Sequence, residues 1–332
     1  MKRLIDKIAW WIPIKKLREK FRNNFSKEKE YDNINHLQNE DTYNPYSLLE
    51  NKEYDPDTIA QVEIGIFTYC NRQCHFCTNS IINRHEKNIY MDEKLYIKIL
   101  KELKEFKRLG YITYSRYNEP TADRIILKRI KQAREILPNI WLTLNTNGDY
   151  LTKEYLDEFA EAGLNHMQIQ CYLNKNESFD VENIIKPRMM KLINKLGLEY
   201  EETKNDHYIY ELKLSYQKMH IYYQARNIIN YGWNMAGLIK DIKPYNRTEP
   251  CYLPITHLYI DYNGDVVPCC IIRTEIDEHK NFIMGNLNNN SIKEIRNNKK
   301  FTKFRNEAIN SPQNLFPCNS CALGVQYTRK DI

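Results

Sequence analysis

The run Cys70-Asn-Arg-Gln-Cys74-His-Phe-Cys77 decides how the rest of the chain is interpreted, because its three cysteines stand four and three residues apart. It follows the segment Gln61–Tyr69, in which the apolar residues Val62, Ile64 and Ile66 alternate with other residues. This alternation is typical of a strand with one buried face. The cysteines therefore lie on the loop after the carboxyl end of a strand, the rim on which α/β barrels build their active sites.

Three clustered thiolates favour an iron–sulfur cluster at Cys70, Cys74 and Cys77. A cubane cluster is usually held by four cysteine sulfurs, so three protein ligands leave one iron open to another molecule. The alternative is zinc, which prefers CxxC pairs and, in structural sites, four protein ligands. A triplet after the first strand of an α/β chain fits a structural zinc site poorly.

Composition limits the class of protein. The chain has 332 residues and 42% hydrophobic content, enough for one large domain with an appendage, and no run approaches the ~20 apolar residues of a membrane span. Nine cysteines without a secretory signal favour metal binding in a reducing cytoplasm over a disulfide scaffold. Residues 1–25 hold eight basic and two acidic residues, which equals the net charge of +6 for the whole chain. The rest is therefore neutral, and we expect no nucleic-acid partner.

The N-terminal segment 1–25 combines lysines with Trp10 and Trp11, a composition suited to the headgroup layer of an anionic membrane. This predicts a cytoplasmic protein with peripheral contact at the inner face of the membrane. The alternative is a helix packed on the body or on a partner chain. The stretch 8–18 also resembles an N-terminal segment of bacterial surface-polysaccharide glycosyltransferases and their neighbours. Residues 26–58 are charged and rich in Asn, and predict a linker or a strap.

From Ala60 onward, strand and helix patterns alternate, which predicts a parallel sheet with right-handed crossovers. Four to six such units are too few for an eight-fold barrel. The expected strands are 61–69, 111–115, 140–144 and 166–171, followed by a strand-rich stretch at 208–225; the expected helices are 91–109, 123–137, 152–162 and 187–196.

The cysteine triplet, with Phe76 before its last member, resembles the CxxxCxxC signature of the radical S-adenosylmethionine (SAM) superfamily. The resemblance covers about Ala60 to Arg329 and implies a partial (β/α)6-type barrel over residues 59–245. In that family the open iron binds SAM, and an electron from the cluster cleaves SAM to a 5′-deoxyadenosyl radical. It also implies an external one-electron reductant.

Two further loops resemble the segments that hold SAM in this family. Where the family has GGEP, this chain has Tyr117-Asn118-Glu119-Pro120, so both glycines are replaced while Glu119 and Pro120 remain. The segment Asn145-Thr146-Asn147-Gly148 is similar to the family's TNG segment. The resemblance thus assigns Asn118, Glu119, Thr146 and Asn147 to SAM; the alternatives are a surface acid at Glu119 and an ordinary turn at the second segment.

Two more residues are candidates on position alone. Arg226 follows the fifth strand region and is suited to a bidentate contact with the SAM carboxylate, the alternative being a surface arginine. Cys171 ends the fourth predicted strand. If its side chain faced the barrel interior, its thiol could return a hydrogen atom to a substrate radical. The alternative, which we favour, is a buried structural cysteine.

A second cysteine set lies near the C-terminus. Residues 258–269 predict a hairpin around Asn263-Gly264, and Ser291-Ile-Lys-Glu294 is a capping box opening a helix to about Glu307. Sulfur ligands alone allow zinc or iron. The spacing resembles the SPASM or twitch extension, here over residues 246–332, and this resemblance implies one auxiliary [4Fe–4S] cluster. Its ligands would be Cys251, Cys269, Cys318 and Cys321, with a swap of Cys270 for Cys269 left open.

The predicted function is radical SAM chemistry on a carbon–hydrogen bond. One hypothesis is oxidation, or else epimerisation, of a carbohydrate-type small molecule; in the oxidation the auxiliary cluster takes the second electron. A second is a peptide-modifying epimerase or maturase. A rival outside radical chemistry is a zinc-binding, membrane-associated interaction protein. The fold and the cofactor do not choose the substrate.

Overall fold

The computed structural model describes residues 53–235, 237–242 and 245–323. The basic segment 1–25 and all but the end of the segment 26–58 lie outside these residues, as do the last nine residues of the chain. The proposals made for the N-terminal segment therefore rest on sequence alone.

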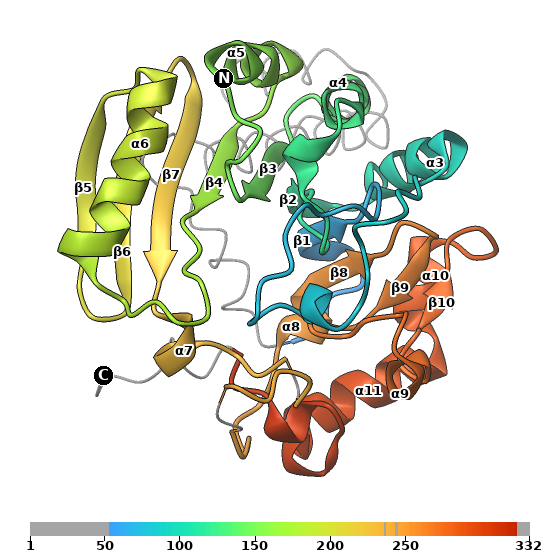
Figure 1. Ribbon diagram of the computed structural model, residues 1–332. Helices are drawn as coiled ribbons and strands as arrows, with labels where there is room; N and C mark the ends of the chain where they lie inside the picture. The colour runs from blue at the N-terminus through green and yellow to red at the C-terminus, as the bar shows by residue number, and fades with distance from the viewer. Residues whose placement is uncertain (1–52, 236, 243–244, 324–332) are drawn as a thin grey trace, which may run out of the picture. The chain divides into compact units, whose positions relative to one another are not determined.

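Within the described residues, ten strands form one sheet in the order β10-β9-β8-β1-β2-β3-β4-β7-β6-β5. The strands from β8 through β1, β2, β3 and β4 to β7 are parallel, and the outer strands at both ends are antiparallel. Figure 1 shows this sheet curving from β5 at one end to β10 at the other. The strands are β1 (Thr58–Ile64), β2 (Arg108–Thr113), β3 (Trp141–Thr146), β4 (His166–Gln170), β5 (Tyr200–Asn205), β6 (Ile209–Tyr216), β7 (Met219–Arg226), β8 (His257–Ile260), β9 (Asp265–Val267) and β10 (Gly285–Asn286).

Helices connect the parallel strands, as the βα pattern predicts. They are α3 (Glu93–Leu103), α4 (Ile125–Ile136), α5 (Lys153–Ala162), α6 (Lys186–Leu196), α7 (Ile228–Tyr231), α8 (Leu253–Thr256), α9 (Asp277–Lys280), α10 (Ile292–Asn297) and α11 (Lys299–Asn310), with shorter helical turns at Thr78–Ser80, Pro120–Ala122, Val181–Ile185, Pro312–Asn314 and Cys318–Ser320. Together with the parallel strands they confirm the predicted α/β partial-barrel class.

Two predicted helices have the wrong extent. The helix expected over 91–109 begins after its N-cap, Asp92, and ends at Leu103. Gly110, the residue directly after the expected helix, lies inside β2, where a Cβ would stand 2.1 Å from the carbonyl oxygen of Ala60 on β1. The glycine thus permits the close approach of two strands. The helix opened by the capping box breaks at Asn298, whose side chain caps α11 by accepting a hydrogen bond from Phe301 N.

One face of the sheet packs on the helices. Tyr114, which follows β2, is buried and its hydroxyl lies 2.7 Å from that of Tyr96 on α3. The side chains of Ile169, near the end of β4, and of Leu192 on α6 both lie next to Gly148. Residues one position away on each strand, such as Glu63, therefore face the opposite side, which we call the inner face.

The second cysteine region joins the same sheet. The predicted hairpin is confirmed as β8 and β9, whose turn has Gly264 at φ +87°, and the capping box of Ser291 and Glu294 is also confirmed. β8 pairs with β1 in parallel, and β9 returns antiparallel to β8. Arg273, in the loop after β9, donates to Asn79 Oδ1 at 3.2 Å, so this loop contacts the turn that follows the first cysteine set. No helix among the described residues is long and apolar enough to cross a membrane.

Candidate metal centres

The first cysteine set occupies the loop between β1 and the turn Thr78–Ser80. Cys77 caps that turn, and its sulfur accepts a hydrogen bond from Asn79 N at 3.5 Å. Burial raises the pKa of Cys70 to about 11 and that of Cys74 to about 12. Repulsion from other cysteines of the set contributes to both of these raised pKa values, so the three thiols lie close to one another.

This environment fits a group that brings its own positive charge. Thiols with raised pKa values stay protonated in the bare protein, whereas bound metal deprotonates a coordinating thiol outright. A backbone N–H aimed at a ligand sulfur is one of the contacts that tune iron–sulfur clusters. Among the described residues, no three Cys, His, Asp or Glu side chains converge as ligands of a single metal ion. A cubane makes a different demand, because each cysteine binds its own iron.

Hydrogen bonds tie the cysteine loop to the loop after β3. Arg72 forms a bidentate ion pair with Asp149, with Nε 2.7 Å from Oδ2. Asn71 donates to the same carboxylate at 2.8 Å and accepts from Asn147 Nδ2 at 2.8 Å. The predicted TNG-like segment is therefore part of the rim that holds the first cysteine set.

Glu119 is not a surface acid, because its side chain is only 3% exposed. Its Oε1 accepts from Thr121 N (3.0 Å), Thr121 Oγ1 (2.6 Å) and Thr146 Oγ1 (2.5 Å), and its Oε2 accepts from Asn147 N at 2.8 Å. Burial raises the pKa of Glu119, and these hydrogen bonds oppose that rise. The carboxylate thus joins the loops after β2 and β3, and Oε2 keeps capacity for another donor.

Asn118 is the polar residue of this rim that most clearly lacks a partner among the described residues. Its side chain is 8% exposed, and both Oδ1 and Nδ2 are buried without a hydrogen bond. Buried amides are nearly always satisfied, so an unsatisfied one at this place points to a missing ligand. The amide can donate to a carboxylate and accept from an ammonium group, the two ends of an amino acid.

The second cysteine set also comes together in the fold. All four of its members are buried: Cys251, Cys269, Cys318 and Cys321. Repulsion from other thiols of the set contributes to the raised pKa values of Cys251, Cys318 and Cys321. Burial raises the pKa of Cys251 to about 11 and that of Cys321 to about 12. Leu323 N donates to Cys321 Sγ at 3.3 Å, as Asn79 N does in the first set. Four buried thiols with this contact fit a closed cluster.

Of the two neighbouring cysteines, Cys269 is the one that interacts with the other three members of this set. Charge interactions link the Cys270 thiol to Tyr117 and Tyr259, while those of Cys251, Cys318 and Cys321 all involve Cys269. A hydrogen bond between the two neighbouring thiols is the largest cause of the raised pKa of Cys269. The arrangement favours Cys269 as the fourth ligand.

Cys171 lies just past β4, and its N–H still bonds to Gln224 O on β7 at 2.7 Å. Burial raises its pKa to about 11, and Tyr223 and Arg188 of α6 lie beside the thiol. It shares the helix-packed face with Ile169, two residues earlier. This is the setting of a buried cysteine, the alternative favoured above, and the hydrogen-donor role remains a prediction.

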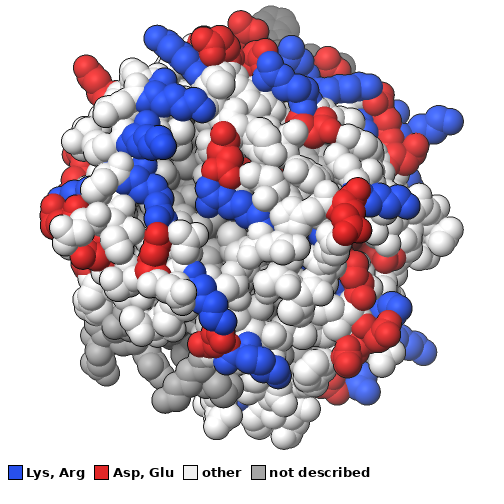
Figure 2. All heavy atoms as spheres, viewed as in Figure 1, with Lys and Arg blue, Asp and Glu red and all other residues white. Residues whose placement is uncertain are grey.

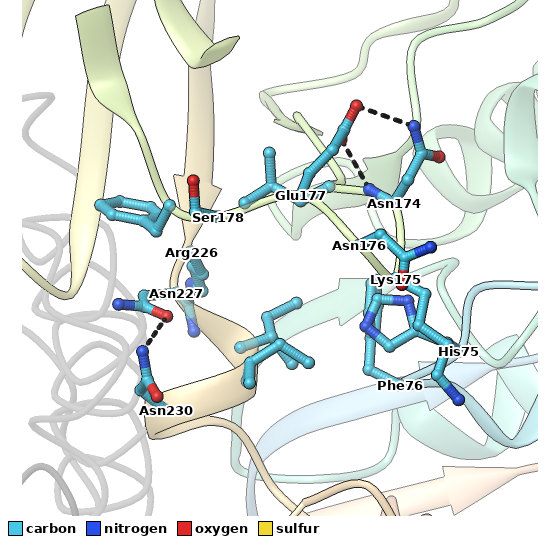
Figure 3. Close-up of a pocket in the computed structure, with 14 residues that line it drawn as sticks. His75, Phe76, Asn174, Lys175, Asn176, Glu177, Ser178, Arg226, Asn227 and Asn230 are labelled. Atoms are coloured by element: carbon cyan, nitrogen blue, oxygen red, sulfur yellow. Dashed lines mark hydrogen bonds between the residues drawn. The ribbon is translucent and has the colours of Figure 1, made fainter. Parts of the chain in front are cut away.

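Arg226 lines a pocket of about 310 Å³ at the rim, between the cysteine loop, the loop after β4 and the end of β7. Figure 3 shows His75 and Phe76 on one wall and Arg226 and Asn227 on the opposite wall. The pocket has the volume of a small-molecule site. It places Arg226 across from the residues between Cys74 and Cys77.

The inner face of the sheet is mostly polar, with the apolar residues Ile59, Leu109 and Trp141 at the amino ends of their strands. Tyr111 Oη donates to Gln61 Oε1 at 2.5 Å, and Gln168 Nε2 donates to Tyr222 O at 3.1 Å. Most of these side chains are partly exposed, so they are open to solvent or to a ligand. The polar positions of this face include Gln61, Glu63, Tyr111, Thr113, Ser115, Thr143, Asn145, His166, Gln168, Gln170, His220, Tyr222, Gln224 and Arg226.

On the one face displayed in Figure 2, the charged side chains of the described residues do not form a field of one sign. Figure 2 shows Lys and Arg intermixed with Asp and Glu on the face it displays. This mixture agrees with the neutral composition of the body and gives no support to a nucleic-acid surface.

Sequence reasoning missed several residues that the fold brings to the metal centres. The pKa of Tyr172 is raised by burial and by the nearby Cys74 and Cys77, and its ring lies 5.0 Å from that of Phe76. Arg116 and Arg273 are each 1% exposed and reach between the two cysteine regions. These contacts join residues that are far apart in the chain, so no local sequence pattern predicts them.

Comparison with family models matches both cysteine regions. Residues 64–188 match the radical SAM superfamily, and residues 251–322 match SPASM, an iron–sulfur cluster-binding domain. The first match contains Cys70, Cys74 and Cys77, and the second contains the four cysteines of the other set.

The chain is also similar to individual proteins and to a solved structure. The S-adenosyl-L-methionine-dependent 2-deoxy-scyllo-inosamine dehydrogenase of Niallia circulans is 23% identical over 247 residues, 74% of this chain and 85% of the dehydrogenase. The PqqA peptide cyclase of Bradyrhizobium diazoefficiens is 36% identical over 126 residues, 37% of this chain and 32% of the cyclase. A crystal structure of BtrN in complex with AdoMet and 2-DOIA has a TM-score of 0.59 at 20% identity, covering 80% of this chain and 93% of BtrN.

Proposed function

Because the chain belongs to the radical SAM superfamily and carries a SPASM iron–sulfur domain, we propose that it oxidises a hydroxyl-bearing carbon of a cyclitol or sugar. Family membership confirms the expected cofactors, a [4Fe–4S] cluster with SAM and an auxiliary iron–sulfur cluster. It also identifies the chain as an enzyme of the oxidoreductase type. When bound, these cofactors supply the electron that cleaves SAM, the 5′-deoxyadenosyl radical that abstracts hydrogen, and an acceptor for the second electron.

The polar inner face is the observation that carries the choice of substrate. A polyhydroxylated ring presents donors and acceptors in several directions, and it needs partners of both kinds when it leaves water. Partly exposed glutamine and tyrosine side chains on β1, β2, β4 and β7, together with Asn145 on β3, supply such partners. An apolar substrate would leave these groups unpaired, at a cost to binding.

The Niallia circulans dehydrogenase supports the same choice. By its name it acts on 2-deoxy-scyllo-inosamine, an aminated cyclitol, and the similarity extends over 85% of its length. The BtrN structure contains AdoMet and 2-DOIA in a protein of the same fold. We therefore place hydroxyl-bearing rings first among candidate substrates.

The residues of the two metal centres take distinct roles in this proposal. Cys70, Cys74 and Cys77 hold the SAM-binding cluster, and Cys251, Cys269, Cys318 and Cys321 hold one closed auxiliary cluster. Asn118 contacts the amino-acid end of SAM, and Arg226 pairs with its carboxylate. Glu119, Thr146 and Asn147 shape the floor of that site through the hydrogen bonds that join their loops.

A peptide substrate is the second candidate, and one observation favours it. The PqqA peptide cyclase is 36% identical to this chain, a higher identity than that of the dehydrogenase, although over a third of each protein. An epimerase would in addition need a hydrogen donor near the substrate. The environment of Cys171 on the helix-packed face does not favour it for that task.

The test uses the anaerobically reconstituted full chain with SAM, dithionite and a panel of cyclitols and sugars, beginning with 2-deoxy-scyllo-inosamine. We expect substrate-dependent formation of 5′-deoxyadenosine and of a ketone, with deuterium from the carbinol carbon appearing in deoxyadenosine. The Cys70→Ala variant is the control and should form neither product. Deuterium transfer from a peptide and from no polyol would reject the proposed substrate class.

We further propose that residues 1–25 bind the anionic inner face of the cytoplasmic membrane and that an external one-electron reductant supplies the first electron. The support for membrane contact is the cluster of lysines and tryptophans in the sequence. Deletion of residues 1–25 should abolish co-sedimentation with liposomes containing anionic lipid. Equal sedimentation of the full and the shortened chain would refute this contact.

A further inference from the structure

Tyr117 connects the two cysteine regions through hydrogen bonds at both ends of the residue. Its backbone oxygen accepts from Asn79 Nδ2 at 3.0 Å, and its hydroxyl donates to the carbonyl oxygen of Cys270 at 2.5 Å. Asn79 in turn donates its N–H to Cys77 Sγ, and Cys270 is bonded directly to Cys269. A continuous path of covalent bonds and hydrogen bonds therefore runs from a ligand of the first centre to a ligand of the second.

The side chain of Tyr117 is held between two guanidinium groups. The Arg273 guanidinium carbon lies 3.8 Å from the centre of the tyrosine ring, and that of Arg116 lies 5.2 Å from it. Arg273 also donates to Asn79 Oδ1 at 3.2 Å. Cation–π contacts of this kind strengthen when the groups are desolvated, and both arginines are 1% exposed.

Arg116 fixes the far end of the path. Its Nε is 2.7 Å from Asp261 Oδ1, and its other nitrogens donate to Cys270 O (3.0 Å) and Ile272 O (2.6 Å). Gly65 makes room for this reach, because a Cβ there would stand 3.2 Å from Cβ of Arg116. The carbonyl that accepts the tyrosine hydroxyl is therefore held by two donors.

The backbone of Tyr117 adopts a conformation that a bulky residue rarely takes. Its φ is +60°, in the left-handed region, where a residue with a bulky side chain is strained. A glycine would take this conformation without cost. Strain of this kind persists where the surroundings over-determine it, and it is concentrated at functional sites.

We propose that Tyr117 is the bridge through which an electron passes between the two metal centres, an inference that rests on the proposed function. Oxidation of a secondary alcohol to a ketone releases two electrons and two protons. One of each leaves as the hydrogen atom taken by the deoxyadenosyl radical, and one electron and one proton remain. Return of that electron through Tyr117 to the first centre makes the sum alcohol plus SAM to ketone, 5′-deoxyadenosine, methionine and a proton. No external electron is then consumed after the first.

The variant Tyr117→Phe tests the bridge because it removes the hydroxyl link to Cys270 and keeps the ring between the arginines. Tyr216→Phe is the matched control, since it removes a tyrosine hydroxyl bonded to Asp157 at 2.6 Å, away from both centres. The measured quantity is the rate at which an electron given to the reconstituted full chain equilibrates between the centres, followed without substrate by freeze-quench paramagnetic resonance.

We expect a slower equilibration in Tyr117→Phe, with iron content and both midpoint potentials unchanged, and a wild-type rate in Tyr216→Phe. A protein with 3-fluorotyrosine at position 117 keeps the hydroxyl link and should equilibrate at the wild-type rate. An unchanged rate in Tyr117→Phe, or a slowed rate in the fluorotyrosine protein, overturns the bridge.

The same variants separate the bridge from the proposed reaction. If no polyol is oxidised and Tyr117→Phe still slows equilibration, the substrate proposal fails and the bridge stands. If a polyol is oxidised, limiting reductant should give many ketones per electron in wild type and about one in Tyr117→Phe, the stoichiometry of a single hydrogen abstraction. Equal yields per electron in both proteins overturn the bridge.

Discussion

Replacement of Glu119 by alanine should loosen the rim that surrounds the first metal centre. Its carboxylate accepts hydrogen bonds from two backbone N–H groups, of Thr121 and Asn147, and from two threonine hydroxyls. The hydroxyls of Thr121 and Thr146 lie 3.1 Å apart, so one of them can donate to the other after the change. The two backbone N–H groups would be left without acceptors in a buried place.

The magnitude follows from these two groups. A buried donor left unsatisfied costs about 1–3 kcal/mol, so Glu119→Ala should lower the free energy of unfolding by about 2–6 kcal/mol. Glu119→Gln keeps one oxygen acceptor, but its NH2 group then faces one of the two N–H donors. We therefore expect it to lower the free energy of unfolding by about 1–3 kcal/mol. With a urea m-value of about 2–3 kcal/mol/M, a loss of about 4 kcal/mol lowers the unfolding midpoint by roughly 1.5–2 M.

The assay is urea unfolding of the cofactor-free chain, together with hydrogen exchange at the amides of Thr121 and Asn147. Both amides should exchange faster in Glu119→Ala than in wild type. Glu135→Gln on α4 is the control, because this side chain is exposed. A midpoint for Glu119→Ala within the error of wild type, with unchanged exchange at both amides, would refute the reasoning.

Three further changes probe other parts of the account. Burial raises the pKa of Glu63 from 4.5 to about 7, so its contribution to stability is present below pH ~4.5 and is lost as pH rises to ~7. Glu63→Gln should therefore gain stability relative to wild type over that interval, and parallel curves of unfolding free energy against pH would contradict this. Gly110→Ala brings a methyl group against the Ala60 carbonyl and should cost at least about 1–3 kcal/mol in thermal or urea unfolding; a neutral variant would show that β1 and β2 can separate. Asn118→Ala removes an unsatisfied amide, so stability should hold while the Kd for SAM rises about tenfold, near 1.4 kcal/mol; calorimetry giving an unchanged Kd would remove Asn118 from the site.

Local signals in the sequence predicted the parts of the fold that depend on local physics. The alternation before Cys70 located β1, although the strand ends at Ile64, and the capping box located the start of α10. Gly110 misled the helix prediction because a glycine needed for close strand contact looks the same as one that ends a helix. The break at Asn298 was missed because its capping role depends on the extended backbone there.

The sequence likewise predicted some features of the metal centres and not others. The cysteine spacing identified the ligand candidates, and the resemblance to the radical SAM superfamily supplied their grouping. No local sequence pattern predicted that Arg116 would pass Gly65, just after β1, and reach Asp261, because these two residues are 145 positions apart in the sequence. The unsatisfied amide of Asn118 and the polar inner face likewise became visible only with the strands in register.

The most direct test of the account is the iron and zinc content of the anaerobically reconstituted chain, for wild type and for the variant with Cys70, Cys74 and Cys77 all replaced by alanine. Two four-iron clusters predict about eight irons per chain in wild type, about four in the variant, and no zinc in either. About four irons in wild type, none in the variant and about one zinc in both would contradict the account. The second cysteine set would then be a structural zinc site, which can neither accept nor return an electron.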